Sequence, residues 1–204
     1  MSSFDPPISL RQRTRQAVQA DIADVAKQLF LKQGYERTSV DQIAEAAGMS
    51  RRSVFRYFST KEDIICGPYE DVGENIAQQL QHRPLDEAVW VSMQTVFGDV
   101  ITEAYGQGSA LRVTDQIIRS TPVLRASYLE KIDRMQALCV KAVLERAQRR
   151  GHPFDQDDPL PAAVIGAAFS CLLSAQSAAI QGADADVERL LRRCMSTLAP
   201  RLSF

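Results

Sequence analysis

The sequence is poor in the residues that usually hold metal ions. Its 204 residues include two histidines and four cysteines, and no two cysteines form a C-x-x-C pair. Structural zinc sites are mostly built from closely spaced cysteine and histidine pairs, so the sequence predicts no metal site and no cofactor. The scattered cysteines instead fit reduced thiols in a cytoplasmic protein; they are Cys66, Cys139, Cys171 and Cys194.

The sequence also gives no clear sign of a targeting signal or a membrane anchor. Residues 1–20 mix Asp5, two prolines and three arginines with polar residues, unlike a secretory leader. Residues 160–180 carry no charge and are long enough to span a membrane. However, Pro161, Gln176 and three serines dilute their hydrophobicity, and acidic residues flank them where an anchor favours Lys and Arg. We therefore expect a buried helix, no membrane partner and a cytoplasmic location.

Motifs for catalysis are absent as well. The sequence contains no G-x-S-x-G, and no glycine-rich phosphate loop precedes a lysine. The acidic pair Asp157 and Asp158 falls in an expected loop at no diagnostic spacing. The sequence therefore predicts a protein that is not an enzyme.

The charge is nearly balanced overall but uneven along the chain. A formal net charge of -1 argues against a protein that binds nucleic acid over its whole surface. Residues 1–66 have ten Lys and Arg against eight Asp and Glu, whereas residues 67–204 have fourteen against seventeen. Arg51, Arg52, Arg56 and Lys61 form a local basic patch in the first part, which points there for an anionic partner.

Helical periodicity runs through the whole chain, and no stretch longer than a few residues alternates as a strand does. The sequence therefore predicts an all-α protein. A first helix is expected from about Val18 to Gln33, ended by Gly34, with Arg11, Arg13 and Arg15 preceding it as a flexible basic arm. Longer helices are expected over about 61–81, 85–105, 110–119, 122–150 and 160–182, with a last helix capped by Asp184 and ending near Leu198.

Two short helices are predicted between the first helix and the long ones, over about 40–47 and 51–58. Ser39 with Gln42 forms a capping box for the first of them, and Ser50 caps the second. Gly48 supplies the positive φ of a tight turn between them, and Thr60 with Asp63 repeats the capping signature. This arrangement is a helix-turn-helix, in which the second helix enters the major groove of DNA.

The exposed face of that second helix is rich in groups that bind DNA. It offers Arg51, Arg52, Ser53 and Arg56, and the planar guanidinium of arginine reads guanine with two hydrogen bonds. The alternative is a solvated cationic face on a purely structural helix. The coincidence of three caps, a glycine turn and flanking aromatic residues favours DNA binding.

The segment GYERTSVDQIAEAAGMSRRSVFRYFSTKEDII, residues 34–65, resembles the DNA-binding domain of the TetR family of bacterial regulators. The resemblance covers about residues 18–66. It implies a helix-turn-helix domain over residues 1–66, and a helical-bundle domain for ligand binding and dimerisation over residues 67–204. By the same resemblance, the positions that face bases hold Ser50, Arg51, Arg52, Ser53 and Phe55, and the positions that hold phosphates are Thr38, Ser39, Arg56, Tyr57 and Lys61.

Phe55 departs from the family pattern, because tyrosine is commoner at its position. The departure removes a hydroxyl contact. Packing is therefore an alternative role for this ring.

The segments KEDIICGPYEDVGENIAQQL, residues 61–80, and DDPLPAAVIGAAFSCLL, residues 157–173, resemble regulators near mycofactocin genes whose C-terminal domain takes acyl-CoA-like ligands. The resemblance implies a small hydrophobic or acyl-CoA-like effector. Large apolar residues on the expected inner helix faces either fill a core or line a pocket for it; they are Trp90, Met93, Phe97, Leu111, Ile118, Leu124, Tyr128, Met135, Phe169 and Leu172. Arg112 and Arg119 share a helix face and either meet an acidic head group or pair with neighbours such as Asp115.

The last two expected helices suggest a homodimer. The first of them is rich in Ala, Ser and Gly, which allow close helix approach. The second carries an apolar stripe of Val187, Leu190, Leu191, Cys194, Met195 and Leu198. The sequence thus predicts a transcriptional repressor whose partners are double-stranded operator DNA, a small-molecule effector and a second copy of the chain. The alternatives are an architectural DNA-binding protein without a ligand, and a helical small-molecule carrier or enzyme.

Overall fold

The computed structural model describes residues 9–105, 110–182 and 186–199. Every regular element within these ranges is a helix, which confirms the predicted all-α class. The elements are α1 (Leu10–Gln33), α2 (Val40–Ala46), α3 (Arg51–Tyr57), α4 (Asp63–Cys66), α5 (Pro68–His82), α6 (Val89–Tyr105), α7 (Ala110–Ser120), α8 (Pro122–Arg149), α9 (Leu160–Gln181) and α10 (Val187–Thr197).

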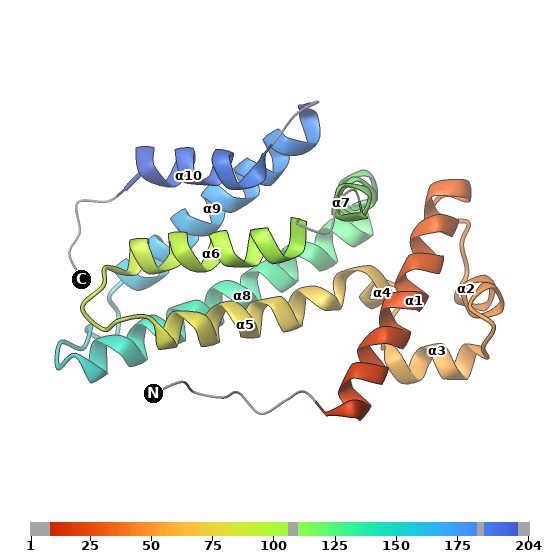
Figure 1. Ribbon diagram of the computed structural model, residues 1–204, viewed down its shortest axis with the longest axis horizontal. Coiled ribbons are helices and arrows are strands. Elements are labelled where there is room, and N and C mark those ends of the chain that lie inside the picture. Colours follow the sequence, from red (N-terminus) through yellow and green to blue (C-terminus); the bar gives the residue numbers. More distant parts are fainter. Residues whose placement is uncertain (1–8, 106–109, 183–185, 200–204) are drawn as a thin grey trace.

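Two hydrophobic cores organise these helices. Figure 1 shows α1, α2 and α3 at one end of the molecule and the long helices α5, α6, α8, α9 and α10 stacked beside them. The larger core lies among the long helices, and the smaller one among the first four. Ile117, Ile118 and Leu124 from α7 and α8 belong to the smaller core, so the two parts of the chain share apolar contacts. A domain boundary at residue 66 remains a prediction.

The predicted flexible arm before α1 is wrong, because α1 already begins at Leu10. Arg11, Arg13 and Arg15 are therefore helical residues. The physical reason is local: no Gly or Pro interrupts residues 10–17, and Arg, Gln and Ala all favour helices. The Thr14 hydroxyl also donates to the Leu10 carbonyl oxygen at 2.9 Å, within the first turn.

The single helix expected over 61–81 is divided into α4 and α5. Pro68 is the first residue of α5. Since proline has no N–H and its ring clashes with the preceding turn, it begins a helix more readily than it continues one. The next helix, α6, begins at Val89 rather than at Leu85. In the preceding loop, Arg83 binds Glu87 through two hydrogen bonds, of which the Nε bond is 2.8 Å.

The start of the last helix also differs from the expectation. Asp184 lies outside the described residues, and the Asp186 side chain caps α10 by accepting a hydrogen bond from the Arg189 N–H at 3.0 Å. Three residues of the predicted dimer stripe, Val187, Leu191 and Met195, are buried in the chain's own core. They therefore do not form an exposed seam. The indole N–H of Trp90 on α6 donates to the Met195 carbonyl oxygen at 3.0 Å, which ties α10 to the bundle.

Helix α9 is buried along one face only, and not all round as expected. By length and composition it is apolar enough to cross a membrane, but Ile165, Ala168 and Phe169 pack it into the larger core. Its opposite face is exposed and made of small residues, Ala163, Ala167, Ser170, Ser174 and Ala178. We call these five residues the α9 face.

Candidate functional site

Side-chain caps shape the helix-turn-helix as the sequence predicts. The Ser39 hydroxyl accepts from the Gln42 N–H at 3.2 Å, and the Gln42 side chain accepts from the Ser39 N–H at 2.9 Å. Ser50 accepts from the Ser53 N–H at 3.1 Å, and Gly48 has a φ of +67° in the turn. These local bonds fix where α2 and α3 begin, and Gly48 allows the tight turn between them.

Apolar contacts then hold α3 with one face inward. Val54 is its buried residue and packs in the smaller core with Ile43 and Ala44 of α2. Phe58, one turn after Val54, is also buried, whereas Arg51, Arg52, Phe55 and Arg56 are exposed on the opposite side of α3. The recognition helix is therefore a rigid platform with a polar outer face.

The outer face of α3 carries the residues predicted to meet bases. Arg51, Arg52 and Phe55 are exposed, and Phe55 does not pack into the core. The Arg51 guanidinium binds Asp41 at 3.1 Å and lies 5.5 Å from the centre of the Phe55 ring. Among the described residues Arg52 has no ion-pair partner. The geometry thus presents Arg52 directly, whereas Arg51 has to leave Asp41 to reach a base.

The residues predicted to hold phosphates lie in different environments. Ser39 and Arg56 are exposed. Thr38 is only 1% exposed, and its hydroxyl donates to the Gly34 carbonyl oxygen at 2.8 Å. A direct phosphate contact by this side chain would require it to leave that partner. The structure therefore brings Ser39 and Arg56 to the surface, but not Thr38.

Lys61 and Tyr57 are half-buried at the edge of the same surface. The Lys61 ammonium donates to the Tyr35 carbonyl oxygen at 2.7 Å and lies 3.7 Å from the centre of the Tyr35 ring. Burial lowers the pKa of Lys61 against the opposing effect of nearby glutamates. The Tyr57 ring contacts the guanidinium groups of Arg15 and Arg56, 5.7 and 5.2 Å from its centre. Phosphate binding by Lys61 and Tyr57 remains a prediction.

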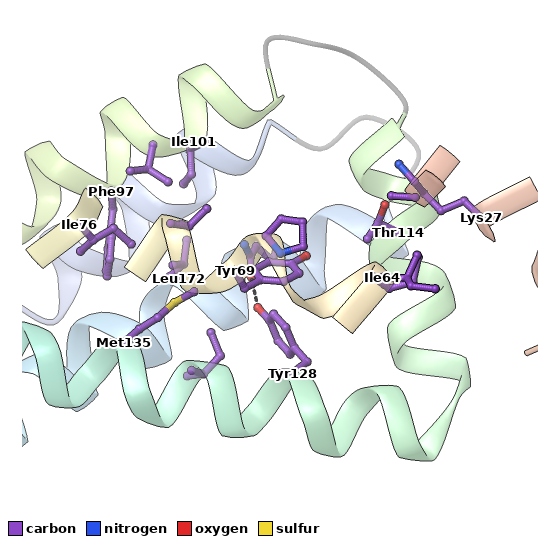
Figure 2. Close-up of a pocket in the computed structure, with 17 residues that line it drawn as sticks. Lys27, Ile64, Tyr69, Ile76, Phe97, Ile101, Thr114, Tyr128, Met135 and Leu172 are labelled. Carbon is purple, nitrogen blue, oxygen red and sulfur yellow. Dashed lines mark hydrogen bonds between the residues drawn. The ribbon is translucent and has the colours of Figure 1, made fainter. Parts of the chain in front are cut away.

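An apolar cavity of about 250 Å³ lies between the helix-turn-helix end and the long helices (Figure 2). Four of the ten residues predicted to contact a ligand line it, namely Phe97, Tyr128, Met135 and Leu172. The other lining residues are Ala23, Lys27, Ile64, Ile65, Pro68, Tyr69, Val72, Ile76, Val100, Ile101, Thr114, Ile132 and Gln176.

The remaining predicted ligand residues lie elsewhere. Trp90 and Met93 are buried in the larger core and do not line the cavity. Phe169 does not line it either, but its ring packs edge-on against the ring of Phe97, with 5.1 Å between the ring centres. Ile118 and Leu124 pack in the smaller core. The side chain of Leu111, like that of Arg112, lies outside the described residues.

A few polar side chains interrupt the apolar lining of the cavity. Figure 2 shows Tyr69 and Tyr128 near its middle, Lys27 and Thr114 toward one end, and Phe97, Ile76 and Ile101 toward the other. The Tyr128 hydroxyl donates to Gln176 at 3.4 Å, and burial raises its pKa. Lys27 pairs with Asp24 at 2.6 Å. The cavity is thus mostly apolar, with a few polar groups near its middle and toward the end where Lys27 and Ile64 lie.

Sequence reasoning missed the contributions of α1 and α4 to this cavity. Ala23 and Lys27 lie on α1, and Ile64 and Ile65 on α4. Their spacing fits ordinary helix packing, and nothing in the sequence pattern sets them apart. Only the tertiary arrangement brings them beside Tyr128.

Ion pairs join the two parts of the chain next to the cavity. Lys131 of α8 is only 7% exposed, and its ammonium binds Glu70 of α5 and lies 3.5 Å from Asp63 of α4. Burial alone would lower the pKa of Lys131, but the hydrogen bond and the charges of Glu70 and Asp63 raise it overall. A charged Lys131 therefore links α4, which follows the helix-turn-helix, to the long helices. Arg119, which was expected to meet a ligand or Asp115, donates to the Ser177 hydroxyl at 3.3 Å.

Comparisons with family models match both parts of the chain. Residues 22–65 match the model of bacterial regulatory proteins of the TetR family, and residues 87–203 match the MftR C-terminal domain. The chain is 32% identical to the HTH-type transcriptional regulator TcmR of Streptomyces glaucescens, over 72% of the chain and 67% of that protein. It is 27% identical to the transcriptional repressor AcnR of Corynebacterium diphtheriae, over 84% and 86% respectively.

Solved structures share the fold. The complex of SmeT with triclosan aligns with a TM-score of 0.62 at 20% identity, covering 93% of this chain and 95% of that one. The regulator FadR of Bacillus subtilis in complex with stearoyl-CoA aligns with a TM-score of 0.59 at 17% identity, covering 90% and 98%. The first matched family and both relatives are named as regulators rather than enzymes. Both the helix-turn-helix and the C-terminal domain therefore show that this chain belongs to the TetR family of bacterial transcriptional regulators.

Proposed function

We propose that this chain is a dimeric cytoplasmic repressor that leaves its operator when a compact apolar molecule fills the cavity. One observation carries the proposal: the walls of the cavity come from both parts of the chain. Ala23 lies on α1 of the helix-turn-helix end, whereas Phe97 and Leu172 lie on the long helices. A ligand between them that fits one relative position better than the other shifts the orientation of α3.

We infer the class of effector from the dimensions of the cavity. Its volume of about 250 Å³ exceeds the ~150 Å³ of an apolar protein cavity that takes up benzene. An intact acyl-CoA is much larger, so the proposed effector is a compact molecule rather than the acyl-CoA that the resemblance suggests. Its apolar body lies against Phe97 and Ile101, and its polar end faces Tyr128 and Lys27 (Figure 2).

The α9 face is the proposed seam of the homodimer. Its small, uncharged side chains permit a second copy of α9 to approach closely. A two-fold axis through this seam lets two copies of α3 enter major grooves about one helical turn apart, which a single seven-residue helix cannot do.

The test uses an operator selected from random duplexes by the purified protein, followed by a screen of small apolar acids and phenols. We expect an active compound to weaken operator binding by about 5- to 150-fold. The variant Val72→Phe fills the cavity, so it should keep operator binding and lose the response. Val91→Phe makes the same change at a site that is 47% exposed and does not line the cavity, and it should respond normally.

Three results would contradict the proposal. A full response of Val72→Phe would place the effector elsewhere. Operator binding that no compound changes would favour an architectural DNA-binding protein. Ligand binding without sequence-specific DNA binding would favour a small-molecule carrier.

A further inference from the structure

The first turns of α1 lead toward the C-terminal end of the recognition helix. Arg11, Arg15 and Gln19 are four residues apart and therefore share one face of α1. The Gln19 side chain donates to the Tyr57 carbonyl oxygen at 3.3 Å, and the Arg15 guanidinium lies 5.7 Å from the centre of the Tyr57 ring. Figure 1 shows this part of α1 beside α3. Arg11 continues the same face one turn further out.

Several arginines gather where the start of α1 meets the end of α3, and no carboxylate among the described residues pairs with them. The guanidinium groups of Arg15 and Arg56 both lie within 6 Å of the centre of one tyrosine ring. Over the part of the chain that the structure describes, neither of them, nor Arg11, forms an ion pair with a carboxylate. The first turn of α1 contains no acidic residue, although the helix dipole favours negative charge there. Arg11, Arg13 and Arg15 are all exposed.

This charge is continuous with the DNA-binding surface. Arg56 and Tyr57 belong to α3, and Arg15 extends the same basic surface onto α1. Guanidinium groups bind phosphate oxygens with paired hydrogen bonds, so the backbone of a duplex is the anion that fits a row of exposed arginines. The TetR-family model matches from residue 22 onward, so these arginines lie before the matched segment.

We propose that Arg11 and Arg15 bind the phosphate backbone of the DNA that flanks each half-site. The inference rests on the proposed function, because it needs α3 in the major groove of an operator. A rise of 1.5 Å per residue separates the two arginines by about 6 Å along α1. With α1 running along the backbone, the two guanidinium groups would reach phosphates about two base pairs apart.

The chain supplies its own matched control. Arg13 is exposed like the other two, but a helix turns by about 200° over two residues, so its side chain leaves α1 on nearly the opposite side. Alanine favours helices, so replacing any of the three arginines should leave α1 folded. Circular dichroism of each variant checks this.

The experiment measures operator affinity against salt for Arg11→Ala, Arg15→Ala, Arg13→Ala and the double variant of Arg11 and Arg15. A dimer loses two cations per substitution, so we expect the slope of log K against log salt to become shallower by about 2 for each single variant. The double variant should lose about 4 units of slope. Arg15→Lys should keep the wild-type slope, and so should Arg13→Ala.

Hydroxyl-radical footprints of the same complexes localise the contacts. The double variant should lose protection at the outer edges only, with the centre of each half-site unchanged. Its loss of affinity should be equal for operators that differ only in flanking sequence, because phosphates carry no base identity.

Two outcomes would overturn the inference while the proposed function stands. One is a wild-type slope and footprint in the double variant. The other is a loss that depends on the flanking bases, which would indicate groove readout instead of backbone binding. If the wild-type protein selects no operator, the proposed function fails as well, which is a different result from either of these.

Discussion

The two ends of this molecule are stabilised in different ways. Around α2 and α3, helices of seven residues rest on the smaller core, and hydrogen bonds between near neighbours, such as those of Ser39 and Ser50, fix where they begin. In the long helices, stability comes from apolar packing between residues far apart in the sequence, such as Phe97 against Phe169. The comparison shows that the DNA-binding surface is encoded locally, whereas the cavity is a product of the whole fold.

The largest effect should come from breaking the proposed contact between two copies of the long helices. Ala167→Glu places a charge in the middle of the exposed α9 face. An unpaired charge in an apolar seam strongly opposes association, so the variant should be monomeric and lose specific operator binding. Analytical ultracentrifugation and a binding assay at the same protein concentration measure both.

Ala126→Glu is the control, since it adds the same charge at an exposed site of α8. It should remain dimeric and bind DNA. An intact dimer with normal affinity in Ala167→Glu would show that the seam lies elsewhere. Leu191→Glu is not a suitable probe, because Leu191 is only 2% exposed and its replacement would damage the core.

The next effect concerns the local surface of α3. Arg52→Ala should weaken operator binding by about 1–3 kcal/mol per half-site and relax the preference at particular base pairs. Competition between the selected operator and single-base variants measures this preference. Arg125→Ala, at an exposed position of α8, should bind as the wild type does. Equal losses on specific and random DNA would assign Arg52 to the backbone instead.

A change of similar size should follow from crowding the bundle. A methyl group on Gly73 of α5 would lie 2.6 Å from the Cγ atom of Met135, so Gly73→Ala should lower the free energy of unfolding by about 1–3 kcal/mol. Gly98→Ala meets nothing within 4 Å on α6 and should raise it by up to about 1 kcal/mol. Urea denaturation at one protein concentration compares them. Equal stabilities would mean that Met135 moves aside without cost.

The smallest effect is expected from a single cap. Ser39→Ala removes the hydroxyl that accepts a hydrogen bond from the Gln42 N–H. It should lower the free energy of unfolding by about 1 kcal/mol. Hydrogen exchange of amides in α2 is the most direct measurement, since the change is confined to that end. Ser59→Ala, at an exposed position after α3, should change stability by less than about 0.5 kcal/mol. A loss in Ser39→Ala as large as that in Gly73→Ala would contradict the distinction between the two ends.

The same distinction explains what could be predicted from the sequence. Ser39, Gly48 and Ser50 act on residues within four positions of themselves, so their roles are readable from the sequence alone. The fold class follows from the same helical periodicity. The start of α1 was missed because residues 10–17 have no regular apolar stripe, although their helix propensity is high.

The errors within the candidate site have a common physical origin. The apolar side chains expected to face inward do so wherever the structure describes them, but only four line the cavity, while others such as Met93 and Ile118 fill two separate cores. Which of them border a cavity depends on how α1 and α4 pack against α8.

The position of Trp90 gives the protein an optical property. It is the only tryptophan in the sequence, 6% exposed, and its indole N–H donates to the Met195 carbonyl oxygen of α10. Its fluorescence therefore reports from one known place without any label, far along the chain from α3. An effector that moves α10 relative to α6 will change the wavelength or polarisation of this emission. Rearrangements confined to the helix-turn-helix will leave it constant, so one spectrum distinguishes a signal that crosses the whole molecule from one that does not.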